Sequence, residues 1–98
     1  MHHRIPLLLV MHNNRAYHQE VMHIQRMANR RQRGIINAGI GTTITDPNID
    51  YATLAKSMGL YSEGPITDPK DLGPALKRAV ARVERGETAL VDVVTQPR

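Results

Sequence analysis

Three short apolar runs in the sequence have the length and composition of buried β-strands. The first, Ile5–Met11, is continuous except for Pro6, which lies at its start, where a missing N–H is tolerated. The last, Ala89–Val94, is apolar except for Asp92. A brief extended segment at Leu60–Ser62 lies between them. Apolar runs this short, bounded by polar and turn-forming residues, favour strands over helices.

A helical pattern follows the first run. Over Tyr17–Arg33 apolar residues recur every three or four positions, which predicts an amphipathic helix, and Gly34 is a suitable residue to end it. The apolar stripe consists of Tyr17, Val21, Ile24 and Ala28. Residues 34–49 are rich in Gly, Thr and Asn and predict a loop with at most a short helical turn.

Two further helices are predicted to begin at aspartate caps. Asp50 precedes a short helix that reaches Met58, and Asp68 precedes a longer helix that reaches Gly86. Pro74 lies early in the longer helix, so we expect a tight first turn there and no break. The expected apolar faces consist of Leu54, Ala55 and Met58 in the shorter helix, and of Leu72, Leu76, Val80 and Val83 in the longer one.

Strands and helices therefore alternate along the chain. This order predicts an α/β fold with a partial parallel sheet of about three strands, flanking helices and right-handed crossovers. The length of 98 residues allows one small domain, and we take residues 1–98 as a single partial domain.

Composition narrows the classes of function. Cysteine is absent, which excludes disulfides and thiolate chemistry and favours a cytoplasmic protein, and no apolar run approaches the roughly 20 residues that span a bilayer. The net charge of +4 is concentrated in residues 1–33, where six arginines face one glutamate. The cluster Arg26, Arg30, Arg31 and Arg33 is either a solvated helix face or a surface for RNA or an acidic partner.

Candidate chemistry lies where the first strand meets the first helix. Asn13 and Asn14 follow the strand at the end where parallel α/β sheets bind ligands. An amide oxygen is a hard neutral ligand that suits magnesium, and a loop that enters a helix N-terminus favours a diphosphate. The alternative is that the Asn-Asn pair only closes a turn.

The segment Ile5–Tyr17 resembles the second half of the cofactor motif of thiamine-diphosphate-dependent enzymes of the acetolactate synthase, benzoylformate decarboxylase and pyruvate decarboxylase group. That motif starts with Gly-Asp-Gly and ends with Asn-Asn after an apolar strand. The similarity continues through the stretch 39–59 and the final strand A-L-V-D-V-V. It implies the C-terminal, diphosphate-binding part of such a domain, with the last strand between the other two.

The resemblance also implies roles for individual residues. Asn14 is expected to bind Mg²⁺ through its side chain and Ala16 through its backbone carbonyl, and Asn13 and Tyr17 to belong to the same cofactor-binding segment. Glu20 falls where the pyruvate decarboxylase branch places an acid that handles protons at the substrate. Its alternative role is that of an acid favourable to the N-terminus of a helix.

The Gly-Asp-Gly half of the motif is not among the 98 residues, and neither is the glutamate that activates the thiazolium ring in this group. We therefore expect a fragment of a lyase or transferase for 2-oxo acids that binds no cofactor and is inactive alone. We expect it to join further segments of the enzyme or to form a homodimer or higher oligomer, through the exposed first strand or the face of the helix Tyr17–Arg33.

Overall fold

The computed structural model describes residues 2–96, which divide into two compact units. The first comprises residues 2–13 and Asp50–Thr95, and the second comprises Asn14–Ile49 with Gln96. The boundary between the units falls within the Asn13-Asn14 pair.

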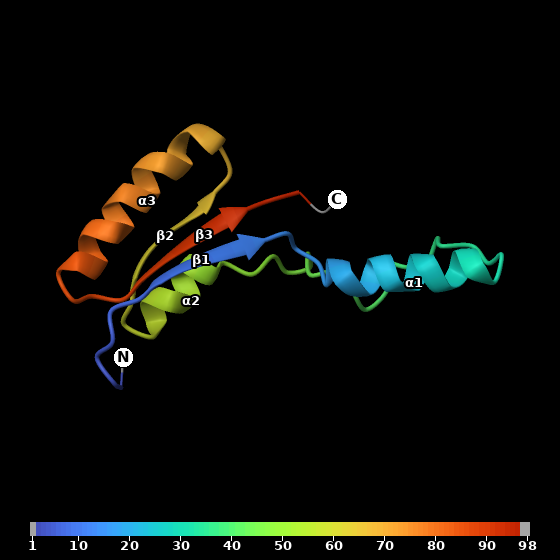
Figure 1. Cartoon of the computed structure of the whole chain (residues 1–98), viewed down its shortest axis with the longest axis horizontal. Coiled ribbons are helices and arrows are strands. Elements are labelled where there is room, and N and C mark those ends of the chain that lie inside the picture. Colours follow the sequence, from blue (N-terminus) through green and yellow to red (C-terminus); the bar gives the residue numbers. More distant parts are fainter. Residues whose placement is uncertain (1, 97–98) are drawn as a thin grey trace. The chain divides into compact units, whose positions relative to one another are not determined.

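The first unit contains a sheet of three parallel strands (Figure 1). β1 (Leu8–Asn13) and β2 (Tyr61–Ile66) flank β3 (Ala89–Val94), so the last strand of the chain is the central one. The predicted α/β class, the parallel pairing and the central place of the last strand are all confirmed.

The extents of the two outer strands differ from prediction. β1 covers Leu8–Asn13 in place of Ile5–Met11, and β2 covers Tyr61–Ile66 in place of Leu60–Ser62. The reason is that β3 supplies backbone partners to β1 along its whole length, so β1 continues through the polar residues at its end. The pairing of β2 is also longer than predicted, although it is irregular between Glu63 and Ile66.

Two helices of this unit begin at the predicted aspartates. In α2 (Tyr51–Ser57) the Asp50 carboxylate accepts from the N–H of Thr53 at 2.7 Å, and in α3 (Pro69–Glu84) Asp68 accepts from a first-turn N–H at 2.9 Å. The bond from the Thr53 N–H lowers the pKa of Asp50. Both predicted helix starts are therefore confirmed.

The C-terminal ends of these helices also follow the sequence pattern. Gly59 and Gly86 have φ of 81° and 86°, the left-handed conformation that closes a helix and that glycine adopts without strain. α3 runs unbroken through Pro74, which lies inside it.

The core lies between α3 and the sheet and is built from small residues. Ala75 and Ala79 of α3 are buried against Ala89 and Val91 of β3. Val80, predicted to face the core, is instead 41% exposed. Leu76 and Val83 of the predicted face do pack against this core, whereas Val80, next to the buried Ala79, lies outside the contact.

α2 packs on the opposite face of the sheet from α3 (Figure 1). Its buried face is formed by Ala52 and Ala55, whereas Leu54 and Met58, predicted to be buried, are 49% and 58% exposed. The Ser62 hydroxyl donates to the Ala52 carbonyl at 2.6 Å, which holds the small-residue face of the helix against β2.

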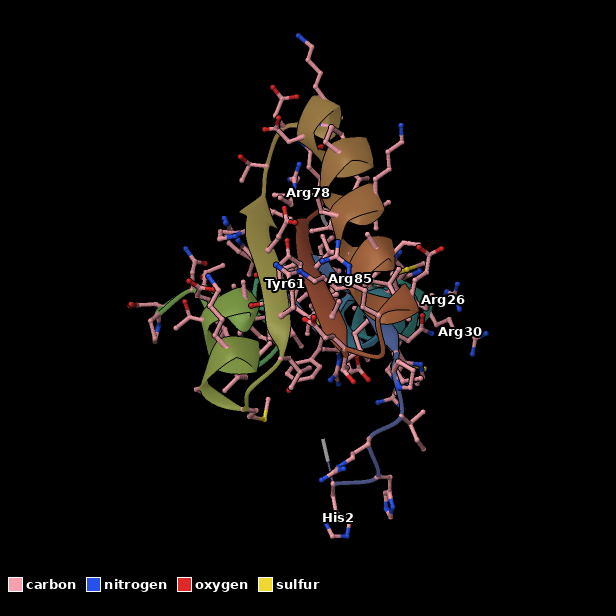
Figure 2. The ribbon with its side chains drawn as sticks, turned by 90° about the vertical axis from the view of Figure 1, so that its left-hand side faces the viewer. His2, Arg26, Arg30, Tyr61, Arg78 and Arg85 are labelled. Atoms are coloured by element: carbon pink, nitrogen blue, oxygen red, sulfur yellow. The ribbon has the colours of Figure 1, made fainter. Side chains whose placement is uncertain are left out.

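A polar cluster joins β2 to α3 at the surface, and Figure 2 shows Tyr61 and Arg78 on these neighbouring elements. The Tyr61 hydroxyl donates to Glu63, and the Arg78 guanidinium donates to both Glu63 oxygens at 2.9 and 2.6 Å. The Arg78 bonds lower the pKa of Glu63, and the bond to Glu63 raises the pKa of Tyr61. The guanidinium of Arg82 lies 4.7 Å from the Tyr61 ring centre.

The second unit is built on α1 (His18–Arg30), which is shorter than the predicted Tyr17–Arg33. Gln32 adopts the left-handed conformation with φ of 52°, and the N–H of Arg33 donates back into the last turn at 2.9 Å. A non-glycine residue thus closes the helix before the predicted stop at Gly34.

The chain after α1 returns to the start of the helix. The N–H of Tyr17 donates to the Thr42 carbonyl and the N–H of Ile44 donates to the Arg15 carbonyl, both at 2.8 Å. Within this unit Ala38 and Thr42 are buried, whereas no residue of α1 is. Residues 34–49, predicted to be a loop, therefore pair with the chain just before α1 and supply the buried residues of this unit.

The basic cluster of the sequence lies at the C-terminal end of α1 and just after it, and its four side chains are exposed. Figure 2 labels Arg26 and Arg30 on this helix. Exposure alone does not distinguish a solvated face from a binding surface, so binding of RNA or an acidic partner stays a prediction. None of the helices in residues 2–96 is long and apolar enough to cross a membrane.

Candidate functional site

Asn13 is the last residue of β1, and its side chain points into the first unit. It is 6% exposed, and its Nδ2 donates to Oδ1 of Asp92 at 3.1 Å. Its carbonyl accepts from the N–H of Thr95 at 2.9 Å. The Asn13 side chain is therefore occupied by the protein itself.

Asp92, its partner, is fully buried on the central strand. Its second carboxylate oxygen accepts from the N–H of Tyr51, the first residue of α2, at 3.3 Å. Gly64 of β2 passes so close that a Cβ there would lie 2.6 Å from the Asp92 carbonyl oxygen. Asp92 thus joins all three strands and one helix at one end of the sheet.

Asn14 begins a tight turn in the second unit. Its Oδ1 accepts from the N–H of Ala16 at 3.1 Å, and Arg15 between them has φ of 56°. This Asx turn holds the amide oxygen in one direction while leaving a second lone pair on that oxygen.

Unpaired polar groups accompany this turn. Within residues 2–96, no N–H or O–H donates to the carbonyl of Ala16, although the residues on either side of it are bonded to the returning chain. Nε of Arg15 is the one buried side-chain nitrogen or oxygen of the described part of the chain that lacks a hydrogen bond. The turn therefore offers an unpaired acceptor to a cation, whereas the unpaired Nε of Arg15 is covered by the chain itself.

Tyr17 and Glu20 follow the turn into α1. Tyr17 is the residue before the helix and is exposed, and its side chain makes no capping hydrogen bond. Glu20 lies in the first turn of the helix and is exposed. It lines a surface hollow of about 460 Å³ together with His23, Ile24 and Thr42. This position is compatible with either role considered for Glu20.

Comparison with protein families identifies the domain. The family model for the thiamine pyrophosphate enzyme, C-terminal TPP binding domain, matches residues 1–93. The chain belongs to this family. Comparison with curated proteins and with solved structures gives no match. Thiamine pyrophosphate, also called thiamine diphosphate, is therefore the cofactor of the enzyme that contains this domain.

The chemistry of the turn in this thiamine pyrophosphate-binding domain is compatible with a divalent cation and a diphosphate. The Asn14 and Ala16 oxygens are the hard neutral ligands that magnesium accepts, and the Arg15 guanidinium complements the oxygens of a diphosphate. The structure brings Asn14, Arg15 and Ala16 together in one turn, with Tyr17 beside them. It separates Asn13 from this set, since the side chain of Asn13 is bound to Asp92.

Two residues of this region have structural roles that the sequence pattern did not predict. Asp92 is the one charged residue in an otherwise apolar final strand, a signal that was present in the sequence. Gly64 gave no such signal, because its requirement arises from the proximity of Asp92 on a different strand.

Proposed function

We propose that this chain contributes the Asn14–Ala16 half of the magnesium-diphosphate site of an acetolactate synthase-like lyase or transferase for 2-oxo acids. The observation that supports the proposal is the Asx turn with an unpaired carbonyl, in a domain of the thiamine pyrophosphate enzyme family. The absence of cysteine supports a cytoplasmic location.

The chemistry of each side chain or carbonyl suggests which part of the site it would bind. Asn14 and Ala16 would hold the metal through neutral oxygens, and Arg15 would donate to the diphosphate. An anionic ligand would come from a Gly-Asp-Gly segment, which is not among the 98 residues. When bound, thiamine diphosphate supplies the nucleophilic carbon and the electron sink for 2-oxo acid chemistry. Tyr17 would contact the cofactor, and Glu20 would hold or deliver a proton at the substrate.

Transient binding of Mn²⁺ with thiamine diphosphate tests this assignment on the 98-residue chain. Without a carboxylate ligand we expect no stable complex, but paramagnetic broadening detects brief occupancy at millimolar concentrations. In amide NMR spectra, the signals of Arg15, Ala16 and Tyr17 should broaden first when both reagents are present. Mn²⁺ alone measures the background from surface carboxylates and histidines. Broadening that is the same with and without thiamine diphosphate, or that is centred elsewhere, would contradict the proposal.

Self-association is part of the same proposal. β1 is an edge of the sheet in the described residues, and Val10 in its middle is 53% exposed. An apolar edge strand with unpaired backbone groups is a template for pairing with another chain. The exposed side chains of Ile24 in α1 and of Tyr17 just before it offer a second apolar surface.

Sedimentation velocity at micromolar concentration should therefore show a dimer or a larger species. Val10→Lys should shift the chain toward monomer if β1 is the contact, because a charged side chain on an edge strand opposes pairing. Val80→Lys, at an exposed position of α3, is the matched control and should not change the distribution. A compact monomer for the unmodified chain would refute self-association.

A further inference from the structure

One face of α1 carries a sequence pattern that is symmetric about the middle of the helix. Glu20, Ile24, Met27 and Arg31 follow one another at intervals of four, three and four residues, a spacing that places side chains on one face of a helix. Glu20, Ile24 and Arg31 are exposed, and Met27 is half-buried. The face therefore has an acid near its start, two apolar side chains in the middle and a base at its end.

A surface hollow adjoins the end of this face. It has a volume of about 310 Å³ and is lined by Ile24, Met27 and Ala28 of the helix and by Arg31, Arg33 and Gly34 after it. An apolar hollow beside guanidinium groups suits an aromatic ring. Tyr17, directly before the helix, is 59% exposed, and it belongs to the same compact unit as the hollow.

We propose that α1 pairs with α1 of a second copy of the chain, antiparallel and about a twofold axis that passes between Ile24 and Met27. This inference rests on the self-association proposed above and assigns it to one surface. In a twofold interface, residue i meets residue j and j meets i. Ile24 would pack against the partner's Met27, and Glu20 would meet the partner's Arg31 at both ends of the pair.

The same alignment brings Tyr17 to the hollow of the second copy. Tyr17 lies three residues before Glu20, and the hollow extends to Gly34, three residues beyond Arg31. When Glu20 faces the partner's Arg31, the Tyr17 ring therefore lies opposite the partner's hollow. The ring would fill the apolar space there and lie beside guanidinium groups, and the twofold axis would repeat this contact.

The charges of the face favour an antiparallel second copy over other occupants. Among the described residues neither Glu20 nor Arg31 has an ion-pair partner. RNA or a wholly acidic partner would satisfy Arg31 but would place negative charge beside Glu20. A parallel pair of helices would set each of these charges against its own kind. An antiparallel copy satisfies both charges, although it covers Tyr17 and Glu20, so the pairing describes the 98-residue chain alone and not the complete enzyme.

Charge exchange in the 98-residue chain tests the pairing, with sedimentation velocity over a series of micromolar concentrations. Glu20→Arg would set arginine against arginine, and Arg31→Glu would set glutamate against glutamate. Each should raise the dissociation constant of the dimer by about tenfold or more. The double variant exchanges the two charges and should restore the value of the unmodified chain. An equimolar mixture of the two single variants should also dimerise, because each supplies the charges that the other lacks.

A matched control and an uncharged variant accompany the exchange. Arg30→Glu makes the same change of charge one position away, on another side of α1, and should leave the dimer intact. Tyr17→Ala should weaken the dimer by about tenfold, because it empties both hollows. Circular dichroism checks that each variant is folded. If a charge variant does not fold, Tyr17→Ala against Arg30→Glu decides the matter.

The outcomes separate this inference from the proposals on which it stands. An unmodified chain that is monomeric would overturn self-association and the helix pairing with it. A dimer that Val10→Lys dissociates, and that Glu20→Arg, Arg31→Glu and Tyr17→Ala leave intact, would overturn the helix pairing alone. A folded double variant that is as weak as the single variants would overturn it too, because its charges are complementary. The metal-binding turn is tested independently by the Mn²⁺ experiment.

Discussion

Replacement of Gly64 by alanine should lower the free energy of unfolding by about 3 kcal/mol or more, the sum of backbone strain and overpacking. Gly64 has φ of 128°, a conformation that side chains disfavour. The added Cβ would lie 2.6 Å from the Asp92 carbonyl oxygen and 2.8 Å from the Asp92 Cβ. Neither atom can retreat easily, because Asp92 is fully buried on the central strand.

Urea denaturation followed by circular dichroism measures this loss. Gly34→Ala is the matched control, since a Cβ at Gly34 meets nothing within 4 Å. Its expected effect is within about 0.5 kcal/mol, as for most surface substitutions. Because a chain of this size has a small free energy of unfolding, we expect a measurable unfolded fraction of Gly64→Ala even without urea. Equal stabilities of the two variants would show that β2 does not pass Asp92 as closely as described.

The features that were predictable from the sequence are those that depend on local chemistry. Asp50 and Asp68 cap their helices because their side chains reach N–H groups only two or three residues away. Gly59 and Gly86 end helices because of their own φ angles. The parallel sheet followed from the alternation of elements, and the central place of its last strand from the family resemblance.

The features that were not predictable depend on contacts between elements. Ala52 of α2 and Ala75 and Ala79 of α3 are buried, although alanines carry little weight in a hydrophobic pattern. Of the predicted faces, Ala55 is buried and Leu76 and Val83 pack against the core, whereas Leu54, Met58 and Val80 are exposed. Periodicity places residues on a helix face, but the close approach of backbones decides which face is buried. Likewise, α1 ends at Arg30 and is closed by Gln32 in the left-handed conformation, before the more suitable Gly34.

The candidate site also combines features that depend on local sequence with features that depend on contacts between elements. An Asn-Asn pair after a strand predicts a turn, and the structure has one at Asn14–Ala16. The metal-binding role of that turn stays a prediction that rests on the family resemblance. The separation of Asn13 from that turn depends on Asp92, which lies far away in the sequence. Tertiary structure thus gives different hydrogen-bond partners to two adjacent and chemically identical residues.

Asn14→Ala should weaken magnesium-dependent binding of thiamine diphosphate by about 100-fold or more, since it removes a metal ligand and not only its support. The appropriate protein is a fusion in which the Gly-Asp-Gly half of an acetolactate synthase domain precedes the chain and supplies the anionic ligand. Asn14→Asp keeps an oxygen at the same position and should retain metal binding. Ala16→Ser changes the side chain but keeps the backbone carbonyl, so it should bind like the unmodified fusion.

Isothermal titration calorimetry of thiamine diphosphate into this fusion, with Mg²⁺ and with a chelator, tests the central claim most directly. The account predicts Mg²⁺-dependent binding by the unmodified fusion and by Ala16→Ser, and its loss in Asn14→Ala while circular dichroism shows an unchanged fold. A folded Asn14→Ala fusion that binds thiamine diphosphate as tightly as the unmodified one, with the same dependence on Mg²⁺, would contradict the assignment of Asn14 as a metal ligand.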